Sequence, residues 1–164
     1  CACLVGSEMC IRDRCILLNL GSEGVLMQED VIEQAISIAA GLAQLLIGKG
    51  INVSVTSNGC DIDTKEQTVI EAGSGLSHFG RINTAFARID LKLPMQEFSI
   101  ILDNMQEYNN KNQRQDSVYV LISANKHGKL KLSAERLMSK QQNKIWIVPC
   151  VVSGNGSLYL EKLD

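Results

Sequence analysis

The middle of the chain, residues 31–91, alternates segments of helical and strand periodicity, and this alternation constrains the fold more than any other feature. Residues 29–48 place apolar side chains at three- and four-residue intervals, which predicts an amphipathic helix. Gly48 and Gly50 are typical of the end of such a helix. Residues 51–56 then alternate apolar and polar side chains, which is the period of a strand. Strands that alternate with helices favour a mainly parallel α/β sheet.

The flanking segments extend this pattern, because short apolar runs predict buried strands and wider apolar spacing predicts helices. The expected strands are 15–20, 118–122 and 145–148, with a short edge strand at 68–71, and the expected further helices are 79–89, 95–105 and 130–138. Asn58-Gly59 predicts a turn, and the Asn- and Gln-rich segment 108–116 predicts an exposed loop. The predicted fold is a three-layer, doubly wound, Rossmann-like α/β domain.

The first residues need separate treatment. Residues 4–14 read LVGSEMCIRDR, which resembles the one-frame translation of a sequencing-library adapter. We therefore expect residues 1–14 to be an artefact, disordered and outside the domain. The alternative is a genuine N-terminal arm. The expected domain covers residues 15–164 and is incomplete at its N-terminus.

Charge and cysteine usage exclude several classes of function. The net charge is −2 at pH 7 and the chain has no basic stripe, which argues against nucleic-acid binding. Cys15, Cys60 and Cys150 are isolated, without a CxxC pair or metal-ligand spacing, as is typical of a reducing cytoplasm. The longest apolar run, residues 35–47, is interrupted by polar residues and is too short to cross a bilayer.

Three segments together resemble the C-terminal half of the domain of unknown function 58 family. They are IAAGLAQLLIGKGINVSVTSNG at 38–59, EAGSGLSHFGRINTAFARIDL at 71–91 and VYVLISAN at 118–125. The resemblance extends over most of residues 15–149. It implies a fold similar to a von Willebrand factor A domain, with a central parallel sheet between two helical layers.

The resemblance also implies a cellular setting. Members of this family usually carry one or two membrane helices and a β-rich segment ahead of this region, and they are associated with MoxR-type AAA+ ATPases. The implied protein is bacterial and membrane-anchored, and this domain lies at the cytoplasmic face of the membrane. Its expected partner is the ATPase. No cofactor and no enzymatic activity are expected.

A metal site is the first chemistry to test, because many von Willebrand factor A domains bind Mg²⁺ through an Asp-x-Ser-x-Ser motif after the first strand. The equivalent residues 19–23 read Asn-Leu-Gly-Ser-Glu, and Ser123-Ala124-Asn125 follows the later strand, where a carboxylate is wanted. Without both anionic ligands a divalent cation loses most of its attraction. We therefore expect a degenerate site, whose remaining candidate ligands are Ser22, Glu23 and Ser123.

The carboxyl ends of the strands are instead expected to form a partner-binding face, because ligands of open α/β sheets gather there. The Gly-Ser-Gly step before the second helix is grouped with this face, either as a structural turn or as an anion-binding helix start. The predicted face comprises Asn19, Ser22, Glu23, Gly73, Ser74, Gly75, Ser123 and Asn125. The alternative function is a Mg²⁺-dependent or phosphate-handling α/β enzyme that uses Ser22, Glu23 and the Gly-Ser-Gly step.

The remaining polar residues form no catalytic constellation. His78 and His127 are far apart in the sequence, and no nucleophile elbow accompanies them. The other expectations are that Asp61 and Asp63 lie in a solvated loop, Arg81 and Arg88 on a solvated helix face, and Trp146 in the core.

Overall fold

The computed structural model describes residues 13–21, 29–112, 117–141, 144–150 and, for the backbone alone, 159–162. Helices and strands alternate along these ranges. In chain order they are β1 (Arg14–Leu18), α1 (Glu29–Gly48), β2 (Val53–Cys60), β3 (Gln67–Gly73), α2 (Gly75–Ala87), α3 (Phe98–Asn112), β4 (Val118–Ile122), α4 (Gly128–Leu137), β5 (Ile145–Val148) and β6 (Tyr159–Lys162).

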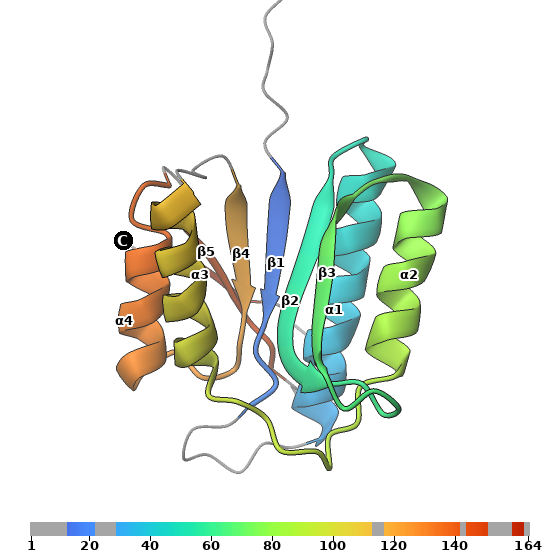
Figure 1. Cartoon of the computed structure of the whole chain (residues 1–164), viewed down its shortest axis with the longest axis horizontal. Helices are drawn as coiled ribbons and strands as arrows, with labels where there is room; N and C mark the ends of the chain where they lie inside the picture. The colour runs from blue at the N-terminus through green and yellow to red at the C-terminus, as the bar shows by residue number, and fades with distance from the viewer. Residues whose placement is uncertain (1–12, 22–28, 113–116, 142–143, 151–158, 163–164) are drawn as a thin grey trace, which may run out of the picture.

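These strands form a 6-stranded sheet in the order β3-β2-β1-β4-β5-β6. The central strands β2, β1, β4 and β5 run parallel, and the outer strands β3 and β6 pair antiparallel with their neighbours. Helices α1 and α2 cover one face of the sheet, and α3 and α4 cover the other (Figure 1). The predicted three-layer α/β architecture with a mainly parallel sheet is therefore confirmed.

Alternate side chains of β1 fill the two sides of the sheet. Ile16 and Leu18 pack with α1 and α2, whereas Cys15 and Leu17 pack with α3 and α4. Side chains of a strand point alternately to opposite faces, so an unbroken apolar run is what a strand buried on both faces requires. The sequence of β1 meets this requirement from Cys15 to Leu18.

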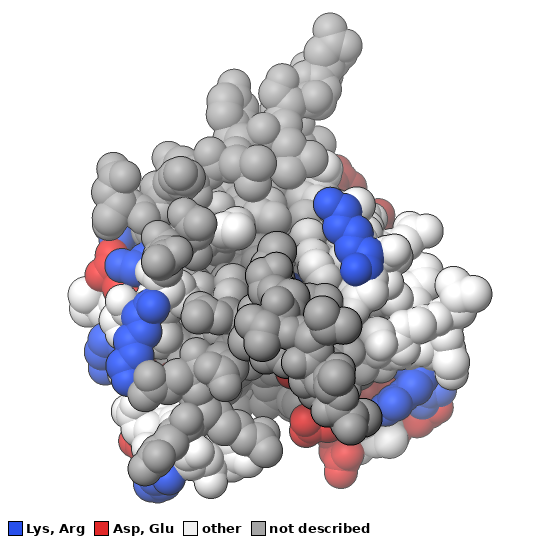
Figure 2. Space-filling view, turned by 90° about the horizontal axis from the view of Figure 1, so that it is seen from above, with Lys and Arg blue, Asp and Glu red and all other residues white. Residues whose placement is uncertain are grey.

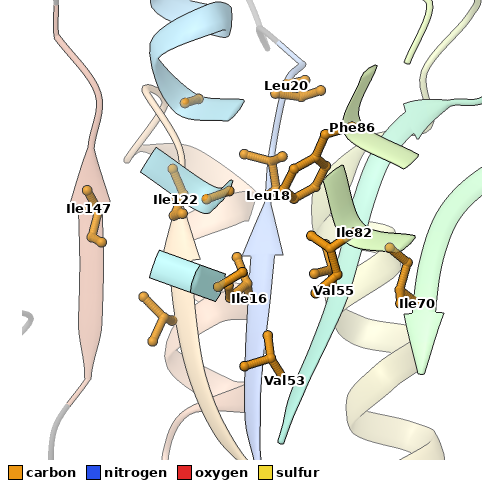
Figure 3. Close-up of a cluster of buried hydrophobic side chains, with 14 of the residues drawn as sticks. Ile16, Leu18, Leu20, Val53, Val55, Ile70, Ile82, Phe86, Ile122 and Ile147 are labelled. Atoms are coloured by element: carbon orange, nitrogen blue, oxygen red, sulfur yellow. The ribbon is translucent and has the colours of Figure 1, made fainter. Parts of the chain in front are cut away.

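The larger of the two cores lies between the sheet and helices α1 and α2. The buried residues of α1 follow helical spacing and include three alanines, which let the helix approach the sheet closely: Ile32, Ala35, Ala39, Ala43 and Ile47. Figure 3 shows Phe86 of α2 beside Leu18, and Ile82 of α2 beside Val55. Full burial of an Ile, Leu or Phe side chain contributes about 1.5–3 kcal/mol.

β2 is longer than the sequence pattern predicts. It continues through Asn58 and Gly59 to Cys60, so the predicted turn at Asn58-Gly59 is wrong. The reversal follows instead at residues 61–66, and β3 returns antiparallel, with Cys60 opposite Gln67. A connection of this length suits a hairpin, since parallel neighbours need a crossover of a dozen or more residues.

Helix α3 also differs from its prediction. It begins at Phe98 rather than at residue 95, and it ends at Asn112. The predicted loop at 108–116 is therefore wrong as far as residue 112, and residues 113–116 lie outside the described ranges. Inside the helix the side chain of Asn109 donates to the Tyr119 hydroxyl at 2.6 Å, so one of the polar residues that favoured a loop contacts β4.

The start of the domain falls slightly earlier than expected. β1 begins at Arg14, whose backbone position pairs with Val53 and with Val118. The predicted boundary between residues 14 and 15 therefore lies inside the strand. Residues 1–12 of the expected leader lie outside the described ranges.

Helix α1 passes a length and composition test for a membrane span, with 20 residues and a mean hydropathy of 1.6. The apolar helix is therefore longer than the run at residues 35–47 that was predicted to be too short to cross a bilayer. In the fold, the buried face of α1 packs against the sheet and belongs to the core. Only this face is used in packing, since 28% of the apolar window is buried and Leu45 on another face is 56% exposed.

Gly59 of β2 offers a test of core packing. A Cβ atom at this position would lie 2.8 Å from Ile89 Cγ2 and 3.0 Å from Leu20 Cδ1. We expect Gly59→Ala to lower the free energy of unfolding by about 1–3 kcal/mol, because well-packed side chains must shift. Urea denaturation measures this change.

The matched control is Gly41→Ala, in the middle of α1, where a Cβ atom would meet nothing within 4 Å. This substitution should stabilise the protein by about 0.5–1 kcal/mol, since alanine favours the helix more than glycine does. Equal effects of the two substitutions would contradict the packing described at Gly59.

Candidate functional site

The carboxyl ends of the parallel strands meet at one edge of the sheet, and three polar side chains lie buried there. Asn19 directly follows β1, Asn58 lies near the end of β2, and Ser123 directly follows β4. β1 separates β2 from β4 in the sheet, so these side chains converge on the end of the central strand. We call Asn19, Asn58 and Ser123 the carboxyl-edge cluster.

Hydrogen bonds join the cluster into a continuous network. Asn58 Nδ2 donates to Asn19 Oδ1 at 3.0 Å, and Asn19 Nδ2 donates to Ser123 Oγ at 3.0 Å. The Ser123 hydroxyl in turn donates to the carbonyl of Asn125 at 2.8 Å. The carboxyl-edge cluster therefore links the ends of β1, β2 and β4 through neutral groups.

The same side chains satisfy backbone groups where the chain leaves β1. The Leu20 N–H donates to Asn58 Oδ1 at 2.8 Å, and the Gly21 N–H donates to Asn19 Oδ1 at 3.0 Å. Buried backbone donors without partners are costly, so both asparagines stabilise this exit from the sheet. Gly21 also allows close packing, because a Cβ atom there would lie 2.9 Å from Asn58 Nδ2.

The cluster has the position of the predicted metal site but a different chemistry. Its members are two amides and a hydroxyl, and their oxygen atoms already accept hydrogen bonds. Within the described ranges, no group of three or more His, Cys, Asp or Glu side chains is placed to hold a metal ion. The candidate ligands Ser22 and Glu23 lie outside those ranges. A hard cation prefers charged oxygen ligands, which the cluster does not supply.

The predicted partner-binding face is wrong in one respect, because Gly73, Ser74 and Gly75 do not lie with Asn19 and Ser123. β3 runs antiparallel to β2, and Gly73 at its end is opposite Val53 at the start of β2. The Gly-Ser-Gly step therefore lies at the amino edge of the parallel strands. The predicted grouping holds only for a β3 that runs parallel to β2, and β3 is antiparallel.

The Gly-Ser-Gly step has a structural role at that edge. The imidazole of His78 is buried, and its Nε2 lies 2.7 Å from the carbonyl oxygen of Val53. A Cβ atom on Gly73 would lie 2.7 Å from His78 Nδ1, so the ring packs directly on the glycine. Gly75 has a φ of +84°, in the left-handed region that glycine adopts readily. These contacts favour the structural turn over an anion-binding helix start.

Basic and acidic side chains are interspersed on the face seen from above in Figure 2, among the residues drawn in colour. No extended stripe of basic residues is visible in the coloured part of this view.

An ion-pair cluster lies beside the carboxyl edge, at the turn after β2. Arg88, at the end of α2, donates from Nε to Asp61 Oδ2 at 2.7 Å and from Nη2 to Asp63 Oδ2 at 2.6 Å. Asp61 Oδ1 also accepts the N–H groups of Asp63 and Thr64. These bonds, led by those from the Arg88 guanidinium, hold the pKa of Asp61 well below its usual range.

The side chains of Asp61 and Arg88 are 21% and 38% exposed, so they are part-solvated as predicted, but they are also paired with each other, which was not predicted. They join the β2–β3 turn to the end of α2, and the backbone reinforces the link through the Ile62 N–H, which donates to the Arg88 carbonyl at 2.8 Å. The sequence shows the acidic pair Asp61-x-Asp63, but not that Arg88, 25 residues further along the chain, is its partner. Asp63, whose side chain is 70% exposed, is solvated as predicted.

Trp146 lies in the core, as predicted, and Cys15 of the predicted buried strand 15–20 lies there too. Trp146 is buried, and its Nε1–H donates to the Ser123 carbonyl at 3.2 Å, which ties β5 to the carboxyl edge. Cys15 is buried, and desolvation raises the pKa of its thiol to about 11. A thiol with this pKa is a poor nucleophile at neutral pH, so Cys15 acts as a small apolar residue.

The chain matches no protein-family model, and no curated protein matches it significantly. The class that the structure defines is thus an α/β domain with a mainly parallel sheet and a neutral polar cluster at its carboxyl edge.

Asn58 tests the importance of the cluster. In Asn58→Ala the Leu20 N–H loses its acceptor and Asn19 loses a donor, and we expect the free energy of unfolding to fall by about 1–3 kcal/mol. Chemical denaturation measures the loss. Asn83→Ala, at an exposed position of α2, should change stability by less than about 0.5 kcal/mol. Similar effects of both substitutions would refute a supporting role for the cluster.

The Arg88–Asp61 pair predicts a pH dependence. The folded-state pKa of Asp61 is depressed, so its stabilisation is complete above the unfolded-state pKa of about 3.9 and is lost as the pH falls toward the folded-state value. Arg88→Met should therefore lower the Tm clearly at pH 7 and much less at pH 2. Thermal scans across this range measure the difference.

Arg81→Met, at an exposed position of the same helix, serves as the control. A Tm difference between Arg88→Met and the parent chain that stays constant from pH 7 to pH 2 would contradict the ion-pair assignment.

Proposed function

We propose that this chain is a non-enzymatic protein-interaction module, similar to a von Willebrand factor A domain with a degenerate metal site. In this proposal it belongs to a membrane-anchored bacterial protein, lies at the cytoplasmic face of the membrane and works with a MoxR-type AAA+ ATPase. The binding surface is the carboxyl edge of the sheet, around Asn19, Ser123 and Asn125.

The topology supports this choice of surface. The connections from β1 and from β4 lead to opposite sides of the sheet, so the order β2-β1-β4 has its switch point between β1 and β4. Ligands and partners of open α/β sheets bind at such switch points, outside the carboxyl ends of the strands. Asn19 and Ser123 end the two strands that flank the switch point.

The observation that carries the non-enzymatic interpretation is the closed hydrogen-bond network of the carboxyl-edge cluster. Asn19, Asn58 and Ser123 direct their polar atoms to one another and to the backbone. Such a network fixes the ends of three strands without a charged group. A rigid polar edge of this kind suits recognition of a protein surface, whereas hydrolytic or phosphoryl-transfer chemistry requires positioned acids, bases or cations.

The loop after β4 offers side chains on the solvent side of this edge. Asn125 is half-buried and its Oδ1 accepts the N–H of His127, which is exposed. This bond holds the loop where α4 begins, because His127 is the residue that precedes Gly128. A partner that docks on the carboxyl edge would therefore meet an ordered loop, with a low entropic cost of binding.

The proposal predicts a position-dependent loss of binding. In a pull-down with a MoxR-type ATPase from the same genome, the double variant Asn125→Ala/His127→Ala should bind at least ~10-fold more weakly than the parent chain, a loss of about 1.4 kcal/mol. Ser74→Ala is the matched control, because Ser74 is exposed at the opposite edge and makes no side-chain cap hydrogen bond.

Two results would contradict the proposal. The first is unchanged binding by the double variant, and the second is an equal loss with Ser74→Ala. A rise in the Tm of the parent chain on titration with Mg²⁺ would favour the metal-dependent alternative, since a ligand of the native state must stabilise it.

A further inference from the structure

β3 (Gln67–Gly73) is an outermost strand of the sheet, and no described strand pairs with its outer side. Such an edge presents unpaired N–H and C=O groups to solvent and is a template for pairing with another strand. Natural edge strands are commonly protected by proline, by charged residues such as lysine, by β-bulges or by being very short. The seven residues QTVIEAG contain no proline and no lysine.

The backbone of β3 defines which groups are available. The Glu66 carbonyl accepts the Asp61 N–H at 2.9 Å and so points toward β2. In an antiparallel ladder successive residues direct their backbone groups to opposite sides. The N–H and C=O groups of Gln67 and Val69 are therefore directed outward. Along β3, Val69 pairs with Thr56 and Ile70 with Val55, and the register shifts between Val55 and Val53 and between Thr56 and Cys60.

Exposed apolar side chains are spaced along this edge. Val69, at the middle of β3, is 57% exposed, although it is a β-branched residue that favours sheet packing. Ile62, in the turn before β3, is 48% exposed, and Leu76, at the start of α2, is 89% exposed. Ile62 and Leu76 are each seven residues from Val69, at opposite ends of the strand.

We propose that β3 pairs antiparallel with β3 of a second copy of this chain, with Val69 opposite Val69 across a two-fold axis. This arrangement joins two six-stranded sheets into one continuous sheet. The Val69 side chains of the two copies then face each other, and Gln67 lies opposite Glu71 of the second copy. The Ile62 end of each strand lies beside the Leu76 end of the other.

Self-complementarity favours a second copy as the occupant of this edge. The one carboxylate of the strand, Glu71, faces an amide, with which it can form a hydrogen bond. An axis at Glu71 would place two carboxylates opposite each other, which is destabilising. An axis at Thr68 would place Val69 opposite Gln67. The axis at Val69 alone pairs apolar with apolar and polar with polar side chains on the exposed face of β3.

The oligomeric state in solution tests this proposal. Sedimentation velocity over a concentration series should show the parent chain in a monomer–dimer equilibrium. Val69→Lys places two ammonium groups opposite each other, and Val69→Pro removes an outward N–H that the pairing with β2 does not use. Both variants should raise the dimer dissociation constant at least ~10-fold while circular dichroism remains that of the folded chain.

Leu45→Lys is the matched control, because Leu45 lies on α1 and is 56% exposed. It should leave the dissociation constant unchanged. A parent chain that stays monomeric over the whole concentration series overturns the proposal. A dimer that Val69→Lys and Val69→Pro leave intact, or that Leu45→Lys weakens equally, also overturns it, because the interface then lies elsewhere.

Cysteine cross-linking tests the register. Directly opposite residues of a hydrogen-bonded antiparallel pair have Cα atoms about 5.5 Å apart, within disulfide range. Val69→Cys should therefore form a covalent dimer on mild oxidation, above the baseline set by the parent chain. Gln67→Cys should not, since its two copies would be offset by roughly 13 Å along the strands. Efficient cross-linking through residue 67 and not through residue 69 refutes the Val69 register.

Discussion

The structure depends on the burial of β1 on both faces and both edges. Its side chains from Ile16 to Leu18 are completely buried, and its backbone forms parallel ladders with β2 and β4 at the same time. One five-residue strand thus supplies alternate side chains to both cores and ends at the carboxyl-edge cluster. Asn19 is buried because the strand before it is, so the position of the candidate site follows from the packing of β1.

Much of the fold could be predicted from local pattern. Helix α1 has the predicted bounds, and β4 and β5 coincide with the apolar runs at 118–122 and 145–148, because burial on both faces leaves an unbroken apolar signature. The pattern failed where a polar residue is buried with a partner. Asn58 favours a turn by composition, yet Asn19 and the Leu20 N–H satisfy its amide inside β2. No local signal encodes a partner that is distant in sequence.

The candidate site could be predicted in part for the same reason. Asn19 and Ser123 were recognisable as polar residues at the ends of buried strands, and the structure brings them within 3.0 Å of each other. Gly73, Ser74 and Gly75 were misplaced because the direction of β3 decides their edge. The six residues between Cys60 and Gln67 are too few for a parallel crossover, so chain length did contain that information.

The hydrogen bond between Asn19 and Ser123 spans 104 positions of the chain. Long-range pairings of this kind slow folding, because loop-closure entropy must be overcome before the contact forms. Synthesis proceeds at about 5–20 residues per second, so β4 is translated roughly 5–20 s after β1. Until then β1, which is apolar from Cys15 to Leu18, lacks one of its two neighbours in the sheet, and a nascent chain in this state is a natural client for a chaperone.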